Sequence, residues 1–166
     1  LPYYLEPVES PVRDDDTARE YPLVMTNGRV PFYHHSTLRN AAAMRELYPV
    51  PEIWIYPDVA KAYGIAPGDW VWVEPKRGIR AKALVTKGIN PGTVCMERFW
   101  HPETMNTKTH GWQETNVNVL SKSTAPFNDV VGTHTLRAYQ VRISKADSAP
   151  EGIWQKPEDF VNWLKA

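Results

Sequence analysis

Residues 21–39, YPLVMTNGRVPFYHHSTLR, join a short apolar segment to a group of cationic side chains. Leu23, Val24 and Met25 form an uninterrupted apolar run, which is typical of a buried strand. The Asn27-Gly28 pair that follows predicts a tight turn, because both residues adopt positive φ at low cost. We therefore expect exposed backbone N–H groups at the end of a core strand.

The sequence after this predicted turn lacks acidic side chains. No Asp or Glu occurs between positions 28 and 45, but Arg and His residues do occur there: Arg29, His34, His35 and Arg39. A guanidinium binds a phosphate group through two parallel hydrogen bonds. The interval thus predicts a site for an anionic ligand, a phosphate in particular. The alternative interpretation is a surface turn with unrelated Arg residues.

Composition limits the classes of protein to which the chain can belong. The chain has 166 residues, of which 42% are hydrophobic, as expected of one compact domain with a core. Its formal net charge is zero, so nucleic-acid or membrane-surface binding has no electrostatic support. The single cysteine, Cys95, excludes an internal disulfide framework and a cysteine-cluster metal or iron–sulfur site. No apolar run approaches the roughly 20 residues of a membrane span.

The N-terminal residues 1–20 are polar and acidic and do not have the pattern of a signal peptide. The chain begins without Met, in an irregular segment that contains proline. We expect a fragment of a longer protein, for which a cytoplasmic location and export in the folded state both remain open. We also expect residues 1–20 to form an extended arm.

Frequent prolines and glycines favour short strands and turns over long helices. Apolar patterns predict strands at residues 21–26, 53–55, 70–74, 79–86, 93–96 and 135–144. Ser36 or Thr37 is expected to cap a helix from Leu38 to about Tyr48, and Pro57 to begin a second helix. A third helix is predicted within a C-terminal tail, residues 147–166. This order of elements predicts a mainly β fold, a mixed barrel with flanking short helices.

Residues 98–125 have a different character, being rich in Thr, Asn, Ser and Gln. A polar segment of this length inside a compact domain is usually functional or disordered. Three histidines in or near it, His101, His110 and His134, do not have the spacing of zinc ligands. We therefore do not expect a metal site in this chain.

Several motifs occur in an order that is similar to a known family. They are TNGR (26–29), YHHSTLRN (33–40), IYPDVAKAYGIAPGDWVWVEPKRG (55–78), KGINPGTV (87–94) and NVLS (118–121). Together they resemble the C-terminal molybdopterin-dinucleotide-binding domain of the dimethyl sulfoxide reductase family of molybdenum and tungsten oxidoreductases. The resemblance covers residues 21–144 approximately, which is most of the chain.

The resemblance implies a six-stranded double-psi β barrel, which we place at residues 21–146. In this family the domain caps a bis-molybdopterin guanine dinucleotide cofactor that carries Mo or W. The remaining domains of the same enzyme share the cofactor and hold the metal ligand and any iron–sulfur cluster. The chain alone is then not catalytic, and its expected partners are those domains and an iron–sulfur electron-transfer subunit.

The resemblance also implies which residues contact the cofactor. The first cofactor loop contains Thr26, Asn27, Gly28 and Arg29, and the second contains His34, His35, Ser36 and Arg39. Further contacts are implied for Asp58, Asn116, Asn118, Ser121 and Arg137. Of these, Arg29, Ser36 and Asn118 are expected to surround one common hollow. The sequence departs from the family pattern where Asn27 and Ser121 each replace a Thr, and where Tyr56 replaces an Asn.

Each of these assignments has an alternative in ordinary protein structure. The His34-His35 pair is also compatible with an exposed surface turn. Asp58 suits the first turn of a helix, where an acid is favourable, and Asn118 suits a buried turn in which its side chain satisfies backbone groups. For the whole chain, the alternative is a non-catalytic double-psi barrel module that binds a protein partner. Within the family, the segments ERFWHPE, NVNVLS and GTHTLRAYQVRI are most similar to the hydratase and dehydroxylase branch.

Overall fold

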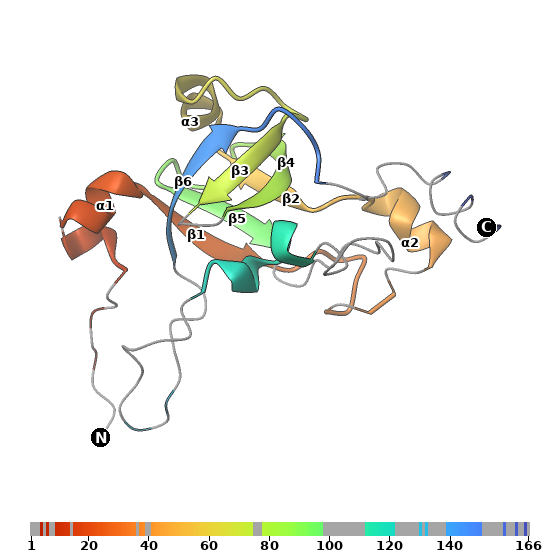
Figure 1. Ribbon diagram of the computed structural model, residues 1–166, viewed down its shortest axis with the longest axis horizontal. Helices are drawn as coiled ribbons and strands as arrows, with labels where there is room; N and C mark the ends of the chain where they lie inside the picture. Colours follow the sequence, from red (N-terminus) through yellow and green to blue (C-terminus); the bar gives the residue numbers. More distant parts are fainter. Residues whose placement is uncertain are drawn as a thin grey trace.

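A computed structural model gives the fold of the chain (Figure 1). It describes residues 4, 6, 9–13, 15–35, 37–38, 41–74, 78–97, 112–121, 130, 132, 139–150, 158, 162 and 165. In this part of the chain the structure is mainly β, with short helices around a barrel.

Within the described ranges, six strands form a closed barrel in the order β1-β5-β2-β4-β3-β6. Their bounds are β1 Leu23–Gly28, β2 Glu52–Ile55, β3 Trp70–Glu74, β4 Ile79–Val85, β5 Thr93–Glu97 and β6 Tyr139–Lys145. The pairs β1/β5 and β2/β4 are parallel, and the neighbours along the rest of the barrel are antiparallel. The predicted six-stranded double-psi barrel is confirmed.

Short helices surround this barrel. Their bounds are η1 Pro11–Arg13, α1 Asp16–Glu20, α2 Ala42–Leu47, α3 Pro57–Ala62, η2 Trp112–Glu114 and η3 Val117–Val119. In Figure 1, α1 and α2 flank the barrel on opposite sides, and α3 lies above it. The helix that begins at Pro57 is confirmed, and in the tail the described residues Glu158, Asn162 and Lys165 are helical. Among the described residues, no helix has the length and apolar character needed to cross a bilayer.

The barrel interior is filled by alternate side chains of the strands. Fully buried members are Met25, Ile53, Ile55, Val71, Val73, Ile79, Val94 and Val141. Strand β4 shows the predicted alternation, since Ile79, Ala81 and Ala83 point inward and are buried. Each large aliphatic side chain buried in this way contributes about 1.5–3 kcal/mol relative to exposure. The barrel therefore has a hydrophobic core of its own.

The structure contradicts the predicted Asn27-Gly28 turn. Strand β1 continues through both residues, which pair with Met96 and Glu97 of β5 in a parallel ladder. Gly28 does not have positive φ. A Cβ atom added at Gly28 would lie 2.9 Å from the Sγ atom of Cys95. A glycine is therefore favoured at position 28 because β1 and β5 approach each other closely there, and not because the chain turns.

The predicted start of the first helix is also wrong. Helix α2 begins at Ala42, and its N-cap residue Ala41 makes no side-chain capping bond. Leu38 has a φ of 69°, in the left-handed region, which is incompatible with a helix there. The Thr37 hydroxyl donates to the carbonyl oxygen of His34 at 2.5 Å, so it closes a turn and does not cap a helix.

The sequence predicted an extended N-terminal arm, but the described part of this arm is not extended throughout. It contains η1 and α1, and α1 is capped by Asp15, whose carboxylate accepts the Ala18 N–H at 3.0 Å. Asp at this position is favourable because it satisfies one of the free N–H groups of the first turn. The Gln140 N–H donates to the Glu9 carboxylate, which joins the arm to β6. The domain boundaries at residues 21 and 146 stay predictions.

Candidate functional site

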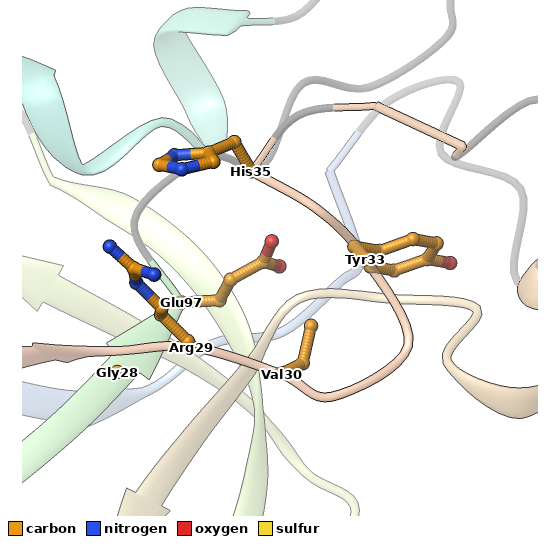
Figure 2. A pocket seen from close by; sticks show the side chains of 6 residues that line it. All are labelled: Gly28, Arg29, Val30, Tyr33, His35 and Glu97. Atoms are coloured by element: carbon orange, nitrogen blue, oxygen red, sulfur yellow. The ribbon is translucent and has the colours of Figure 1, made fainter.

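A small hollow lies where the parallel strands β1 and β5 end. Six residues line it: Gly28, Arg29, Val30, Tyr33, His35 and Glu97 (Figure 2). Gly28 and Glu97 are the last residues of their strands and face each other in the ladder. The cavity volume is about 10 Å³, roughly the room that one water molecule needs. The hollow therefore has room for the edge of a ligand at most and cannot enclose a whole one.

Three polar side chains from different segments meet at this hollow. Figure 2 shows the Arg29 guanidinium and the Glu97 carboxylate on either side of the space that the His35 ring overlooks. Arg29 and His35 are exposed, whereas Glu97 is only 5% exposed. His34 is exposed and packs edge-on against His35, with ring centroids 4.8 Å apart. The site thus offers a guanidinium, an imidazole and a buried carboxylate to one ligand edge.

Tyr33 fixes the loop that follows β1. Its hydroxyl donates to the carbonyl oxygen of Tyr48 at 2.6 Å, and its ring contacts the Tyr48 ring edge-on. Both tyrosines are buried, together with Val50, in a second apolar cluster. This anchor holds the backbone on the N-terminal side of His35 against α2 and the segment after it.

His35 has an unusual backbone conformation, with a φ of 57°. A left-handed conformation costs a residue with a Cβ atom about 1–2 kcal/mol. Such strain persists where the surrounding structure imposes it, and it concentrates at functional sites. Here it turns the imidazole toward the hollow at the end of β1.

A second, wider hollow lies on the outer side of β3 and β4. Its lining residues are Trp72, Gly78, Arg80, Gln113, Glu114, Asn118 and Val119. The cavity volume is about 520 Å³, in the range of small-molecule pockets. Helices η2 and η3 form one wall of it, and both views draw this segment close to the loop that follows β1 (Figures 1 and 2).

Arg80 connects the walls of this second hollow. Its guanidinium forms an ion pair with Glu114 of η2 and stacks on the Trp72 ring, 4.5 Å from the centroid. It also donates to the carbonyl oxygens of Ser148 and Ala149 at 3.2 and 3.1 Å. The Arg80 side chain is 12% exposed. It therefore fastens the segment that carries Asn118 to the barrel.

The structure brings part of the predicted site together. Gly28, Arg29 and His35 line the first hollow. Asn118 is exposed and lines the second hollow, so the expectation of one common hollow is wrong for this residue. The reason is that η3 packs over the outer side of the barrel, whereas Arg29 follows the end of β1. Ser36, Arg39 and Arg137 lie outside the described residues.

Other predicted contacts have structural partners. The Asn116 side chain accepts the Asn118 N–H at 2.9 Å, and the Ser121 hydroxyl donates to the Asn118 carbonyl oxygen at 2.9 Å. Asn116 is buried, and these two bonds hold the backbone on both sides of the exposed Asn118 amide. The buried side chain that satisfies a backbone group in this turn is therefore that of Asn116.

Three predicted cofactor contacts, in β1 and α3, do not line the first hollow. Thr26 and Asn27 are half-buried within β1 and are absent from the lining of the first hollow. Burial raises the pKa of Tyr139, and a hydrogen bond with the Asn27 side chain partly offsets that effect. Asp58 is exposed in the first turn of α3, which Figure 1 places above the barrel and away from the loop after β1. This position fits the alternative role of Asp58 as a helix N-terminal acid.

The cofactor contacts predicted from the sequence did not include Glu97 and Arg80, which line these hollows. The signal for Glu97 is present in the sequence, because an acid directly follows the buried strand residues Val94 and Met96. The side chain at the end of such a strand is well placed to face a ligand. Arg80 gave no such signal, since alternating Arg and Lys on a half-exposed strand are common.

The chain matches known proteins along most of its length. A family model described as "Molydopterin dinucleotide binding domain" matches residues 23–139. Dopamine dehydroxylase of Eggerthella lenta is 44% identical over 149 residues, which are 88% of this chain and 14% of that protein. Acetylene hydratase of Syntrophotalea acetylenica is 33% identical over 113 residues, which are 63% of this chain and 16% of that protein.

A solved structure supports the same conclusion. Acetylene hydratase from Pelobacter acetylenicus has a TM-score of 0.77 and 25% sequence identity, covering 88% of this chain and 21% of that one. The chain thus spans about a fifth or less of the proteins it matches. These relatives are enzymes, which supports the oxidoreductase-domain hypothesis over a protein-binding module. The chain belongs to the molybdopterin dinucleotide-binding domain family.

Proposed function

We propose that this domain caps a bis-molybdopterin guanine dinucleotide that carries Mo or W and is held jointly with the remaining domains of a longer enzyme. The observation that carries the proposal is the convergence of Arg29, His35 and Glu97 at the ends of two parallel strands. When bound, the cofactor supplies the redox or oxygen-transfer chemistry. The residues of this chain bind it, orient it and exclude water from one side of it.

The donor set of the site fits such a cofactor. A pyrophosphate group is best bound by a guanidinium and by backbone N–H groups, which Arg29 and the loop after β1 offer. Pterin and guanine rings present both donors and acceptors, which suit the exposed Asn118 amide and the buried Glu97 carboxylate. We assign further contacts to Thr26, His34, Ser36, Arg39 and Arg137 on the resemblance alone.

Arg29→Ala in the full-length enzyme tests this proposal. We expect the molybdenum or tungsten content and the pterin content to fall severalfold, because the cationic partner of the phosphates is removed. Arg19→Ala is the matched control, since Arg19 is an exposed arginine on α1. The control should retain normal metal and pterin content. If Arg29→Ala retains the same content as the control, the proposal fails.

We further propose that the longer enzyme belongs to the dehydroxylase and hydratase branch. The support is the 44% identity with dopamine dehydroxylase over most of this chain. Reductive dehydroxylation replaces an aromatic C–OH bond by C–H, consumes two electrons and two protons, and releases water. Such a reaction needs an electron donor, for which we propose an iron–sulfur subunit. Hydration, by contrast, adds water without net electron transfer.

The two reactions are distinguished by one assay on the full-length enzyme. We expect oxidation of a reduced viologen dye that depends on an added catechol. A lack of catechol-dependent dye oxidation, combined with hydration of acetylene, would assign the enzyme to the hydratases. Neither result bears on the role of Arg29 in cofactor retention, so the two proposals are tested separately.

A further inference from the structure

Two large apolar side chains are exposed next to each other on the outside of the barrel. Trp54 of β2 pairs directly with Leu84 of β4, and the two are 39% and 37% exposed. The other large hydrophobic side chains exposed in the described part of the chain lie on helices or loops, not on strands. Single exposed apolar residues are normal on a protein surface. A directly paired tryptophan and leucine form the start of an apolar patch instead.

This patch continues without charge onto the neighbouring strands. Cys95 of β5 pairs with Trp54 on the side away from Leu84, and Thr93 of β5 pairs with Val24 of β1. Cys95, Thr93 and Val24 are half-buried and point outward, because the strand residues next to them are buried inside the barrel. We call Val24, Thr93, Cys95, Trp54 and Leu84 the neutral face.

The remaining two strands of the barrel have a different outer surface. On β3 and β6, Glu74 forms an ion pair with Arg142 at 2.7 Å, and Lys145 of β6 binds Asp69 at 2.9 Å. The central parts of protein interfaces are depleted of charged residues and enriched in aromatic ones. The neutral face thus has the composition of the centre of an interface, whereas the surface of β3 and β6 has that of a strand exposed to water.

The size of the neutral face indicates which kind of partner fits it. A stable interface between separate molecules takes about 20–30 residues a side, but the charged pair Glu52 and Lys82 directly borders the neutral face on β2 and β4. The face is therefore too small for a second copy of this chain. A domain of the same polypeptide needs less contact area, because the covalent connection gives it a high effective concentration. The chain covers 14% of dopamine dehydroxylase and 16% of acetylene hydratase, so most of such a polypeptide lies outside it.

We propose that the neutral face docks an apolar, uncharged surface of another domain of the same polypeptide, with Trp54 and Leu84 at the centre of the contact. A charged group of the partner would lose its water there without meeting an opposite charge, which is unfavourable. Thr26, to which we assign a cofactor contact, pairs with Cys95 on the side away from Trp54. A domain on the neutral face is therefore also beside the proposed cofactor site. The docked domain is part of the longer enzyme of the proposed function, and to that extent this inference rests on it.

Hydroxyl-radical footprinting of the native full-length enzyme tests whether the face is covered. Mass spectrometry gives the oxidation rate of each labelled residue relative to the unfolded enzyme. We expect Trp54 to be oxidised as slowly as Tyr33, which is 7% exposed, although Trp54 is 39% exposed in this chain by itself. A rate that corresponds to 39% exposure would overturn the inference. Protection that disappears on strong dilution would assign the face to a second copy and overturn it as well.

A charge placed in the neutral face tests the apolar character of the contact. Leu84→Lys in the full-length enzyme should release the docked domain, because the ammonium group would be buried without a partner. Alkylation of Cys95, followed by mass spectrometry of its peptide, reports the release. Since Trp54 separates Cys95 from Leu84, the substitution leaves the immediate neighbours of the thiol in place. We expect alkylation of Cys95 to become severalfold faster in Leu84→Lys, and an unchanged rate in the folded variant would refute docking on this face.

Leu47→Lys is the matched control, since it makes the same change at an exposed leucine of α2, outside the neutral face. It should leave the alkylation of Cys95 unchanged. If Leu84→Lys does not fold, Leu84→Thr replaces it, because threonine suits a strand and removes most of the apolar contact area. Alkylation of Cys95 at the parent rate in that variant would equally reject the inference.

These results are separable from those on the cofactor. Normal metal and pterin content in Arg29→Ala refutes the proposed function and does not change the footprint of Trp54. A Trp54 that is oxidised as an exposed residue, in an enzyme that retains its cofactor, refutes docking on the neutral face alone.

Discussion

The guanidinium of Arg80 stacks on the indole ring of Trp72, its directly paired neighbour across β3 and β4, at 4.5 Å from the ring centroid. The same guanidinium reaches Glu114 of η2 and the backbone of Ser148 and Ala149. One side chain of the barrel therefore holds two segments that come much later in the sequence. We call this set of Arg80 contacts the Arg80 clamp.

Arg80→Ala should lower the free energy of unfolding of the chain by about 2–3 kcal/mol, because a largely buried charge-assisted network and a cation–π contact are lost. Arg80→Lys should recover only part of this, since an ammonium group cannot reproduce the planar fork. Glu114→Gln should cost less, about 1 kcal/mol at most, because Glu114 is 37% exposed. Urea unfolding followed by tryptophan fluorescence measures all three. Equal stability of Arg80→Ala and the parent chain would contradict the clamp.

Gly28→Ala tests the explanation of the glycine by close approach. The added Cβ would lie 2.9 Å from the Cys95 Sγ, so we expect a loss of about 1–2 kcal/mol from overpacking. In a Cys95→Ala background the same substitution should be nearly neutral, because the obstructing atom is absent. A double-mutant cycle by chemical denaturation gives the coupling energy. A cost that is the same in both backgrounds would assign the effect to the backbone instead.

Asn116 and Asn118 form a natural pair for separating stability from cofactor binding. Asn116→Ala should destabilise the chain by about 1–2 kcal/mol, because the hydrogen bond that the buried Asn116 side chain accepts from the Asn118 N–H of η3 is lost. Asn118→Ala should leave stability almost unchanged, since the side chain is exposed, but it should lower pterin content in the full-length enzyme. Denaturation of the chain and pterin analysis of the enzyme are the two measurements. The reverse pattern would exchange the roles assigned to these residues.

Cys95 is the single thiol of the chain, so alkylation reports on it alone. Burial raises the pKa of this thiol, and a hydrogen bond with the Gly28 backbone only partly opposes the shift. Since the thiolate is the reactive form, the folded chain should react with iodoacetamide more slowly at neutral pH than the unfolded chain. The rate should rise as the pH approaches the raised pKa. Mass spectrometry follows the reaction, and equal rates for the folded and unfolded chains would contradict the protection expected of this partly buried thiol.

The strands of this domain were predictable because their signal is local. Apolar runs and alternation placed β3 at Trp70–Glu74, where the structure has it, and placed β2, β4 and β5 within a residue or two. The Asn27-Gly28 turn was not predictable in this way. The conformation of these residues depends on pairing with β5, which comes much later in the sequence. Asn27 and Gly28 have a local preference for turns, but pairing with β5 places them in a parallel ladder instead. Tertiary contacts often override local propensities in this way.

The sequence predicted only those site residues that belong to a recognisable motif. Arg29 and His35 belong to motifs and do meet at one hollow. Asn118 belongs to a motif as well, but its place over the second hollow depends on the packing of η2 and η3 against the barrel. The burial of Glu97 is likewise a consequence of long-range strand pairing, which one sequence does not reveal.

Each strand of the barrel has a hydrogen-bonded neighbour on both sides, so β1–β6 leave no open edge. An unpaired edge is the usual template for joining the sheets of separate molecules and for aggregation. The loops that carry Arg29, His35 and Asn118 lie outside this ring of pairs. Substitutions and insertions in these loops do not expose an unpaired strand edge. The ligand-contacting parts of the domain can therefore diversify during evolution without promoting aggregation.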